Sequence, residues 1–241
     1  MQEQGHGSSP LKTADRKWEK NLTGYEQRTI GLNVHSADTL TATRQMEKEN
    51  IDKRTAIIRS ALELIAENGF HGAPTAMIAS RACVGTGTIY RYFADKEVLI
   101  REVFDDVEAG LNQMLMADYP ADQSVRLRLE HYFTVLIRFF IANPMKFKFL
   151  GQFYDSPYGV AMRRDKIFAP QEATNRCETM KNLFEQGITE GTIKKLPIPI
   201  LFALFIGSLI SVARDHILGF IELDEHLIRQ TSDACWDAIQ C

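Results

Sequence analysis

Apolar residues recur at helical spacing from Ile51 onward, and this pattern predicts a chain of helices without strands. The first predicted helix carries Ile58, Leu62 and Ile65 on one face, at positions i, i+4 and i+7, and the Asn68-Gly69 pair ends it. There is no internal repeat. The expected fold class is all-α, with a small N-terminal helical module followed by a larger helical body.

Two short helices joined by a tight turn are expected next. Pro74 suits the first position of the earlier helix, because the N–H that proline lacks would be unpaired there in any case. This helix reaches about Ala82, and Cys83-Val84-Gly85 form the turn before a second short helix over residues 86–93. Asp95 can then cap a longer helix. This geometry lets one helix cross the DNA backbone while the next enters the major groove.

Further helices are predicted in the larger body. Asn143-Pro144 closes one apolar stripe, and Gly191 ends the next. The predicted helices cover residues 125–140, 177–188, 200–219 and 227–239.

The stretch from Leu196 to Ala213 is long and uncharged enough to raise the question of a membrane span. Its two prolines leave only residues 200–213 as uninterrupted helix, and Arg214 and Asp215 follow at once. This length is too short to cross a bilayer, so we expect a buried helix and no membrane association.

Residues 1–50 are polar and never show apolar residues at helical spacing. Such a segment cannot bury enough apolar surface to offset its ordering entropy, so we expect an N-terminal extension without fixed structure. A DNA-grasping arm is disfavoured, because the charges of the segment balance. A second interpretation is that translation starts at Met46, which the intact mass of the native protein would decide.

The stretch from Arg54 to Phe104 carries a composite motif. Its members are Ala61, Asn68-Gly69-Phe70, Ile78-Ala79, Ala82, Val84, the run from Gly87 to Phe93, and Lys96-Glu97-x-Leu99. This composite resembles the DNA-binding domain of the tetracycline-repressor (TetR) family of transcriptional regulators. The resemblance implies a three-helix helix-turn-helix DNA-binding domain over residues 51–94 and a helical ligand-binding and dimerisation domain over residues 95–241.

The short helix over residues 86–93 is the expected reading helix. Arg91 is the side chain here that can bond guanine O6 and N7 bidentately, and Gly87 allows close approach to the groove floor. Tyrosine hydroxyls and Lys96 suit phosphates, as does Thr75, and the resemblance implies the same roles. Tyr90 has the alternative of a half-buried aromatic, whereas Ile89 and Phe93 are expected in the core. The candidate DNA-binding residues are Arg54, Thr75, Thr86, Gly87, Thr88, Tyr90, Arg91, Tyr92 and Lys96.

Charge limits how DNA could be bound. The whole chain has a formal net charge of -3, and residues 51–104 contain seven cationic against six acidic side chains. Binding should therefore depend on a few well-placed phosphate contacts and on dimerisation. A two-fold homodimer would match a palindromic operator on double-stranded DNA.

Small residues recur every fourth position in the helix after Ile200, which creates a seam that another helix can approach closely. The resemblance implies that the last two long helices form the dimer. Packing within one chain is the alternative for this seam. The candidate dimer-interface residues are Ala203, Gly207, Ser211, Leu227, Ala234 and Ala238.

Aromatic and methionine residues crowd the region between about 114 and 184, which corresponds to the inducer cavity of the family. This composition suggests a small apolar or aromatic effector. Polar anchors could come from Tyr154, Asp155, Tyr158, Arg163 and Arg164, for which a solvated loop is the alternative. The candidate ligand-binding residues are Met114, Phe133, Phe140, Phe149, Phe153, Tyr154, Tyr158, Met180 and Phe184.

The expected function is a ligand-responsive repressor, because occupying DNA is enough to block a promoter. The ligand would change the tilt of the helix that begins near Asp95. A helical enzyme is one alternative, but no His lies three residues after a Glu beyond residue 6, and neither GxSxG nor a phosphate-cradling glycine loop occurs. Asp105, Asp106 and Glu108 are interpreted as a solvated face.

A thiol-based redox sensor is the other alternative. Cys83 stands where the family usually has Gly, and a left-handed conformation there would cost about 1 kcal/mol. The four cysteines show no CxxC pairing and no metal-ligand spacing with the six histidines. We therefore expect no metal and no cofactor. No signal peptide opens the chain, and a reducing, cytoplasmic location follows.

Overall fold

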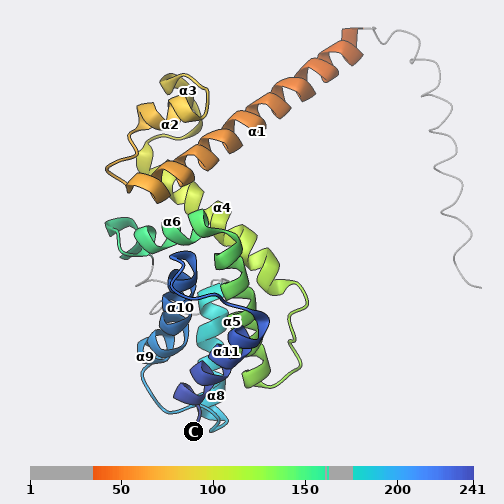
Figure 1. The fold of residues 1–241 in the computed structure, drawn as a ribbon. Coiled ribbons are helices and arrows are strands. Elements are labelled where there is room, and N and C mark those ends of the chain that lie inside the picture. Colours follow the sequence, from red (N-terminus) through yellow and green to blue (C-terminus); the bar gives the residue numbers. More distant parts are fainter. Residues whose placement is uncertain (1–34, 161, 163–175) are drawn as a thin grey trace, which may run out of the picture. The chain divides into compact units, whose positions relative to one another are not determined.

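The computed structural model describes residues 35–160, 162 and 176–241, and these residues confirm the all-α prediction (Figure 1). Residues 53–241 form one compact unit. Within the described part, β-type pairing is confined to a single bridge between Ile193 and Gln240. The helices are α1 (His35–Asn68), α2 (Thr75–Arg81), α3 (Thr86–Tyr92), α4 (Lys96–Met116), α5 (Val125–Ala142), α6 (Pro144–Tyr154), α8 (Arg176–Thr189), α9 (Ile198–Phe202), the π-helix η1 (Ala203–Gly207), α10 (Ser208–Ile217) and α11 (Glu225–Ile239).

The long helix α1 corrects the expectation for the N-terminal extension. Residues 35–50 were expected to lack structure, but α1 runs from His35 and passes through Met46. This segment contains neither glycine nor proline. A helix that has already formed can extend through such residues, because each added residue gains a backbone hydrogen bond without a new nucleation cost. Residues 1–34 lie outside the described residues.

The helix-turn-helix geometry is present in α2 and α3. Pro74 precedes α2 as its N-cap, one position earlier than predicted, and its carbonyl oxygen accepts hydrogen bonds from the amides of Met77 and Ile78. Cys83 has a φ of 54°, which is the left-handed turn conformation that favours glycine. The predicted cap at Asp95 is also confirmed, because its carboxylate accepts a hydrogen bond from the amide of Val98 at 2.8 Å.

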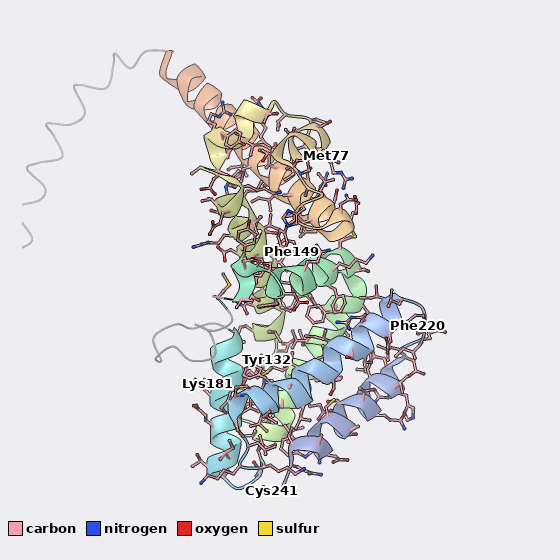
Figure 2. The ribbon with its side chains drawn as sticks, turned by 90° about the vertical axis from the view of Figure 1, so that its left-hand side faces the viewer. Met77, Tyr132, Phe149, Lys181, Phe220 and Cys241 are labelled. Carbon is pink, nitrogen blue, oxygen red and sulfur yellow. The ribbon has the colours of Figure 1, made fainter. Side chains whose placement is uncertain are left out.

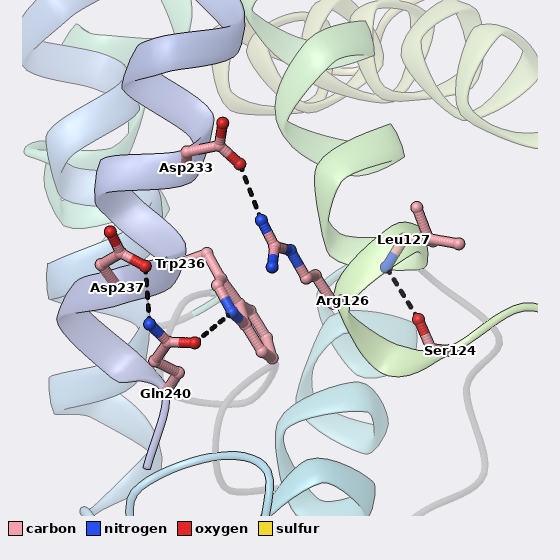
Figure 3. Close-up of polar contacts among 7 residues, drawn as sticks. All are labelled: Ser124, Arg126, Leu127, Asp233, Trp236, Asp237 and Gln240. Atoms are coloured by element: carbon pink, nitrogen blue, oxygen red, sulfur yellow. Dashed lines mark hydrogen bonds and ion pairs between the residues drawn. The ribbon is translucent and has the colours of Figure 1, made fainter.

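The larger body is organised around α5. Buried residues on α5 pack against α4, α6, α8, α10 and α11 within one continuous apolar core. Polar contacts at the surface join α5 to α11. Arg138 makes a bidentate ion pair with Glu225, and Arg126 donates to Asp233 at 3.0 Å (Figure 3). Arg126 also lies over the ring of Trp236.

Helix α6 is an element that the sequence pattern did not predict. Asn143-Pro144 was interpreted only as the end of α5, but Pro144 also begins α6 at a position where a missing N–H is tolerated. Phe149, labelled in Figure 2, and Phe153 are buried on this helix. Phe149 lies 6.5 Å from the ring of Phe70, and Gln152 donates to the carbonyl oxygen of Ala66 at 3.3 Å. Helix α6 therefore packs against the end of α1.

The apolar segment after Pro197 is built from α9, η1 and α10. By length and composition this stretch, Ile198–Ile217, could cross a membrane, and 22% of its most apolar window is buried. The prediction of a buried helix is therefore wrong for most of it. One row of side chains along this stretch is buried, and the side chains on either side of that row are half-buried or exposed. The buried row consists of Leu201, Phe205, Leu209 and Ala213.

Candidate nucleic-acid interface

The outward face of α3 carries most of the predicted reading residues. Thr86, Gly87, Tyr90 and Arg91 are exposed, whereas Thr88 is half-buried. Tyr90 is 54% exposed, which removes the alternative of a half-buried aromatic. A Cβ atom added at Gly87 would meet no heavy atom within 4 Å, so the backbone of α3 is open to close approach there. As predicted, Ile89 and Phe93 are in the core.

Helix α2 adds exposed residues that sequence reasoning missed. Ile78 and Ala79 face the core, so Met77 and Ser80 point outward, and Met77 is labelled in Figure 2. Thr75, the predicted phosphate contact, is half-buried at the first position of this helix. The amphipathic pattern of this seven-residue helix contained the signal for Met77 and Ser80.

Arg91 is held against its neighbour. Its guanidinium donates to the Tyr92 hydroxyl at 3.2 Å and lies 5.1 Å from the centre of the Tyr92 ring. Both side chains come from the last turn of α3, and Arg91 remains exposed. An exposed arginine guanidinium has the planar set of donors that bidentate bonding to a guanine requires.

Two other predicted DNA contacts are engaged inside the protein. The Lys96 ammonium donates to the Phe70 carbonyl oxygen at 2.6 Å, and burial lowers the pKa of Lys96. The Arg54 guanidinium is 2.5 Å from the carboxylate of Glu102 and 5.5 Å from the centre of the Phe93 ring. Both predicted DNA contacts therefore have partners within the protein.

Arg81 is also paired within the module. It lies 2.8 Å from Glu67, and the hydrogen bond from Arg81 lowers the pKa of the Glu67 carboxyl. With Arg54, Lys96 and Arg81 engaged in this way, Arg91 is the cationic side chain that the structure places on the exposed face of α3. This agrees with the small charge excess of the module.

The candidate ligand-binding residues fall into separate aromatic groups. Phe133 and Phe184 both contact Phe205, at centroid distances of 5.9 and 6.2 Å. Phe149 and Phe153 form a second group, in which Phe153 stacks on Phe104 at 4.3 Å. Phe140 lies against Phe139 and Phe147, and Met180 is buried. Met114 and Tyr158 are exposed. The nine residues thus do not converge on one site.

A buried carboxylate lies beside the second aromatic group. Glu108 is 7% exposed and accepts a hydrogen bond from the Tyr154 hydroxyl at 3.4 Å. The expected solvated face of α4 is therefore wrong for Glu108 and holds for Asp105 and Asp106, which are exposed. Tyr154 is half-buried rather than part of a solvated loop. Arg163 and Arg164 lie outside the described residues.

A cleft lies elsewhere in the body, between α5 and α11. It is open to solvent and too shallow to enclose a water molecule, and Leu129, Phe205, Ser232 and Trp236 are among its lining residues. None of the nine candidate ligand-binding residues lines this cleft.

The candidate dimer-interface residues are accessible on the last two helices of the body. Ala203, Ser211, Leu227, Ala234 and Ala238 are exposed, and Gly207 is half-buried with open space where a side chain would lie. The inner faces are in contact, because Cys235 on α11 is buried beside Ser208 on α10 and burial raises the pKa of its thiol. The small-residue seam thus lies outside the packing within one chain.

Among the residues that the structure describes, no three His, Cys, Asp or Glu side chains lie close enough to hold a metal ion. Cys83 and Cys241 are exposed free thiols.

Comparison with known families then decides the assignment. Residues 57–103 match the family described as bacterial regulatory proteins, tetR family, and residues 104–241 match the tetracyclin repressor-like C-terminal domain. The chain belongs to the TetR family. The resemblance inferred from the composite motif is confirmed, and the second match extends it to the helical body.

Individual TetR relatives agree with this assignment. The fatty acid metabolism regulator protein of Bacillus subtilis (strain 168) is 32% identical over 93 residues, which are 37% of this chain and 48% of the relative. The HTH-type transcriptional regulator UidR of Escherichia coli (strain K12) is 38% identical over 67 residues, which are 27% of this chain and 34% of the relative. The chain thus spans less than half the length of these two relatives.

A solved TetR structure shows the fold over most of the chain. A TetR family transcription regulator from Marinobacter aquaeolei VT8 superposes with a TM-score of 0.70 and covers 80% of this chain and 98% of that one. The two chains are 22% identical. This likeness shows that the helix-turn-helix module and the helical body occur together in one known architecture.

Proposed function

We propose that the protein is a transcriptional repressor that binds a palindromic operator as a homodimer and is released by a small apolar or aromatic ligand. The observation that carries the DNA-binding part is the exposed face of α3, where Arg91 is held by Tyr92 beside the open backbone of Gly87. Membership in the TetR family supports the same conclusion. Because its target is chromosomal DNA, we place the protein in the cytoplasm.

Selection of bound duplexes from a random DNA pool tests this proposal. We expect the purified protein to enrich a palindrome, and we expect the Arg91→Ala variant to lose or relax preference at a guanine in each half-site. A bidentate contact of this kind discriminates by about 1–3 kcal/mol. The matched control is Arg59→Ala, which removes an exposed arginine of α1 that pairs with Glu63. The proposal fails if no sequence is enriched at low or moderate salt.

The homodimer is supported by the exposed flank of α9–α10 and the neighbouring flank of α11. Ile200 and Leu227 are exposed there, next to the small-residue seam. Burial of this apolar surface by a second copy would be favourable, by about 25 cal/mol per Å². A two-fold arrangement would present two reading helices about 34–36 Å apart, one for each half of the palindrome.

The ligand part of the proposal is supported by the aromatic groups of the body. Phe104, Phe149 and Phe153 lie between α4, which follows the reading module, and α6. A ligand that separates these rings would change the tilt of α4 and thereby the spacing of two reading helices. The screen should contain aromatic and acyl compounds, since one relative is named a fatty acid metabolism regulator. A compound that stabilises the protein but leaves operator affinity unchanged would contradict this coupling.

A further inference from the structure

The surroundings of Arg54 differ from those of a DNA contact. Its guanidinium lies between an acidic group and an aromatic face, 2.5 Å from the Glu102 carboxylate and 5.5 Å from the centre of the Phe93 ring. Both side chains of the ion pair are partly exposed, at 43% and 39%. Arg54 belongs to α1 and Glu102 to α4, so the pair joins the two long helices on either side of the reading module.

Phe93 connects this ion pair to the reading helix. It is the C-cap of α3, it is 1% exposed, and its ring lies 6.3 Å from that of Tyr92. Tyr92 in turn holds Arg91 through its hydroxyl and its ring. A continuous series of contacts therefore runs from Glu102 through Arg54, Phe93 and Tyr92 to Arg91.

The reading helix depends on contacts at its ends. Helix α3 has seven residues, and Ile89 is the buried one among them. A helix this short is not stable alone, so the surrounding contacts determine its orientation. Whatever fixes Phe93 also fixes the end of α3 that carries the arginine.

We propose that Arg54 is a positioning residue for DNA recognition and not a phosphate contact. With Glu102 it clamps α1 to α4, and through Phe93 it fixes the C-terminal end of α3 and the direction of Arg91. This inference rests on the proposed reading of DNA by α3. It also gives a tilt of α4 a direct route to the reading arginine.

Glu102→Gln separates the two roles by the sign of its effect. If Arg54 binds a phosphate, removal of the Glu102 charge frees the arginine and lessens repulsion of DNA, so operator affinity rises or stays the same. If Arg54 positions α3, the same variant loosens the clamp, and affinity for the selected operator falls by about three- to five-fold. Fluorescence anisotropy at several salt concentrations measures the affinity.

Arg54→Gln supplies a second distinction. A lost phosphate contact would lower the slope of log affinity against log salt by about one and would weaken binding to every duplex alike. The clamp predicts an unchanged slope and a loss confined to the selected operator. It also predicts that the double variant with Glu102→Gln is no weaker than either single variant, because both changes break the same interaction.

A charge control and a charge swap test whether the effect is specific to the pair of Arg54 and Glu102. Glu97→Gln removes an equal charge from α4, but Glu97 pairs with Arg101 of the same helix at 3.5 Å, so operator affinity should not fall. The charge swap Arg54→Glu with Glu102→Arg should recover most of the lost affinity. Circular dichroism melting confirms that each variant is folded before binding is compared.

These binding measurements distinguish failure of the clamp from failure of DNA reading by α3. A wild-type protein that selects no duplex overturns the reading of DNA by α3 and the clamp with it. A wild-type protein that selects an operator, together with unchanged or tighter binding by Glu102→Gln, overturns the clamp alone. Weaker operator binding by both single variants, with swap recovery, establishes the clamp.

Discussion

Lys96 donates its ammonium to the carbonyl oxygen of Phe70 at 2.6 Å, which ties the first turn of α4 to the segment that follows α1. The ring of Phe70 also contacts Phe149 of α6 and the ring of Tyr158. Three parts of the compact unit thus meet at one residue. A hydrogen bond from a charged donor is stronger than a neutral one, so this contact links the first turn of α4 firmly to the packing of the body.

Lys96→Met tests this link. Loss of the hydrogen bond leaves the Phe70 carbonyl oxygen without its donor, and we expect a loss of unfolding free energy of about 1 kcal/mol. Urea denaturation measures it, with Lys195→Met as the control for an exposed lysine in a loop. An unchanged free energy, together with weaker binding to all duplexes, would instead assign Lys96 to a phosphate.

Cys83 provides a prediction about the turn between α2 and α3. It has a φ of 54°, a conformation that glycine adopts at little cost. Cys83→Gly should therefore raise the unfolding free energy by about 1 kcal/mol, less the entropy that glycine adds to the unfolded chain. Cys83→Ser keeps a side chain and should leave it unchanged. A Cys83→Ser protein that loses its response to peroxide would revive the redox-sensor alternative.

Substitution of Phe149 tests the core at the junction of α6 and α1. Phe149 is fully buried, so Phe149→Ala should lower the unfolding free energy by about 3–5 kcal/mol. Phe220 offers a matched control, because it is 74% exposed at the turn between α10 and α11, where Figure 2 labels it. Phe220→Ala should change the free energy by less than about 0.5 kcal/mol. Equal losses in the two variants would contradict the packing described for Phe149.

The dimer proposal predicts the effect of a charge on α11. Ala234 is exposed, so within one chain Ala234→Asp costs only the lower helix propensity of Asp, but it places a carboxylate in the proposed interface. We expect a monomer in analytical ultracentrifugation and a loss of affinity for the full palindrome. Ala121→Asp, in the loop before α5, should remain dimeric. If Ala234→Asp also remains dimeric, the interface lies on another surface.

The ion pair between Arg138 and Glu225 predicts a pH dependence of stability. Hydrogen bonding from Arg138 lowers the pKa of the Glu225 carboxyl below 4.5. Because the folded state favours the ionised form, this stabilisation is present above that value and is lost as the pH falls through the folded-state pKa. Glu225→Gln should therefore melt below the wild type at pH 7 and approach it as the pH falls well below 4.5. Glu222→Gln, in the preceding loop, should show no such convergence.

Local signals in the sequence account for the parts of the fold that were predicted. The end of α1 at Asn68-Gly69 and the cap at Asp95 each depend on residues within one turn of chain. Helix α6 was missed because Pro144 ends one helix and also begins the next. The extension of α1 to His35 was missed because that segment carries no apolar stripe.

In the candidate site too, features set by neighbouring residues could be predicted, and contacts between residues far apart in the sequence could not. The exposure of Tyr90 and Arg91 follows from the face of a short helix, which the sequence pattern contains. The partners of Arg54 and Lys96 lie far along the chain, at Glu102 and Phe70, so spacing alone could not predict that these cations are engaged. For the same reason, aromatic composition indicated a crowded body but did not show which rings lie together.

The π-helix η1 has a consequence for the register of the segment that contains it. Residues four apart in a regular α-helix drift by about 40° per step, so a row of four would wind through about 120°. The wider turn at Ala203–Gly207 offsets part of this drift and keeps Leu201, Phe205, Leu209 and Ala213 in one buried row. A single-residue deletion there would swing the outward flank of α10 round its axis while leaving its sequence intact. A short insertion or deletion at this one turn is thus a way to redirect an entire surface without changing any of its side chains.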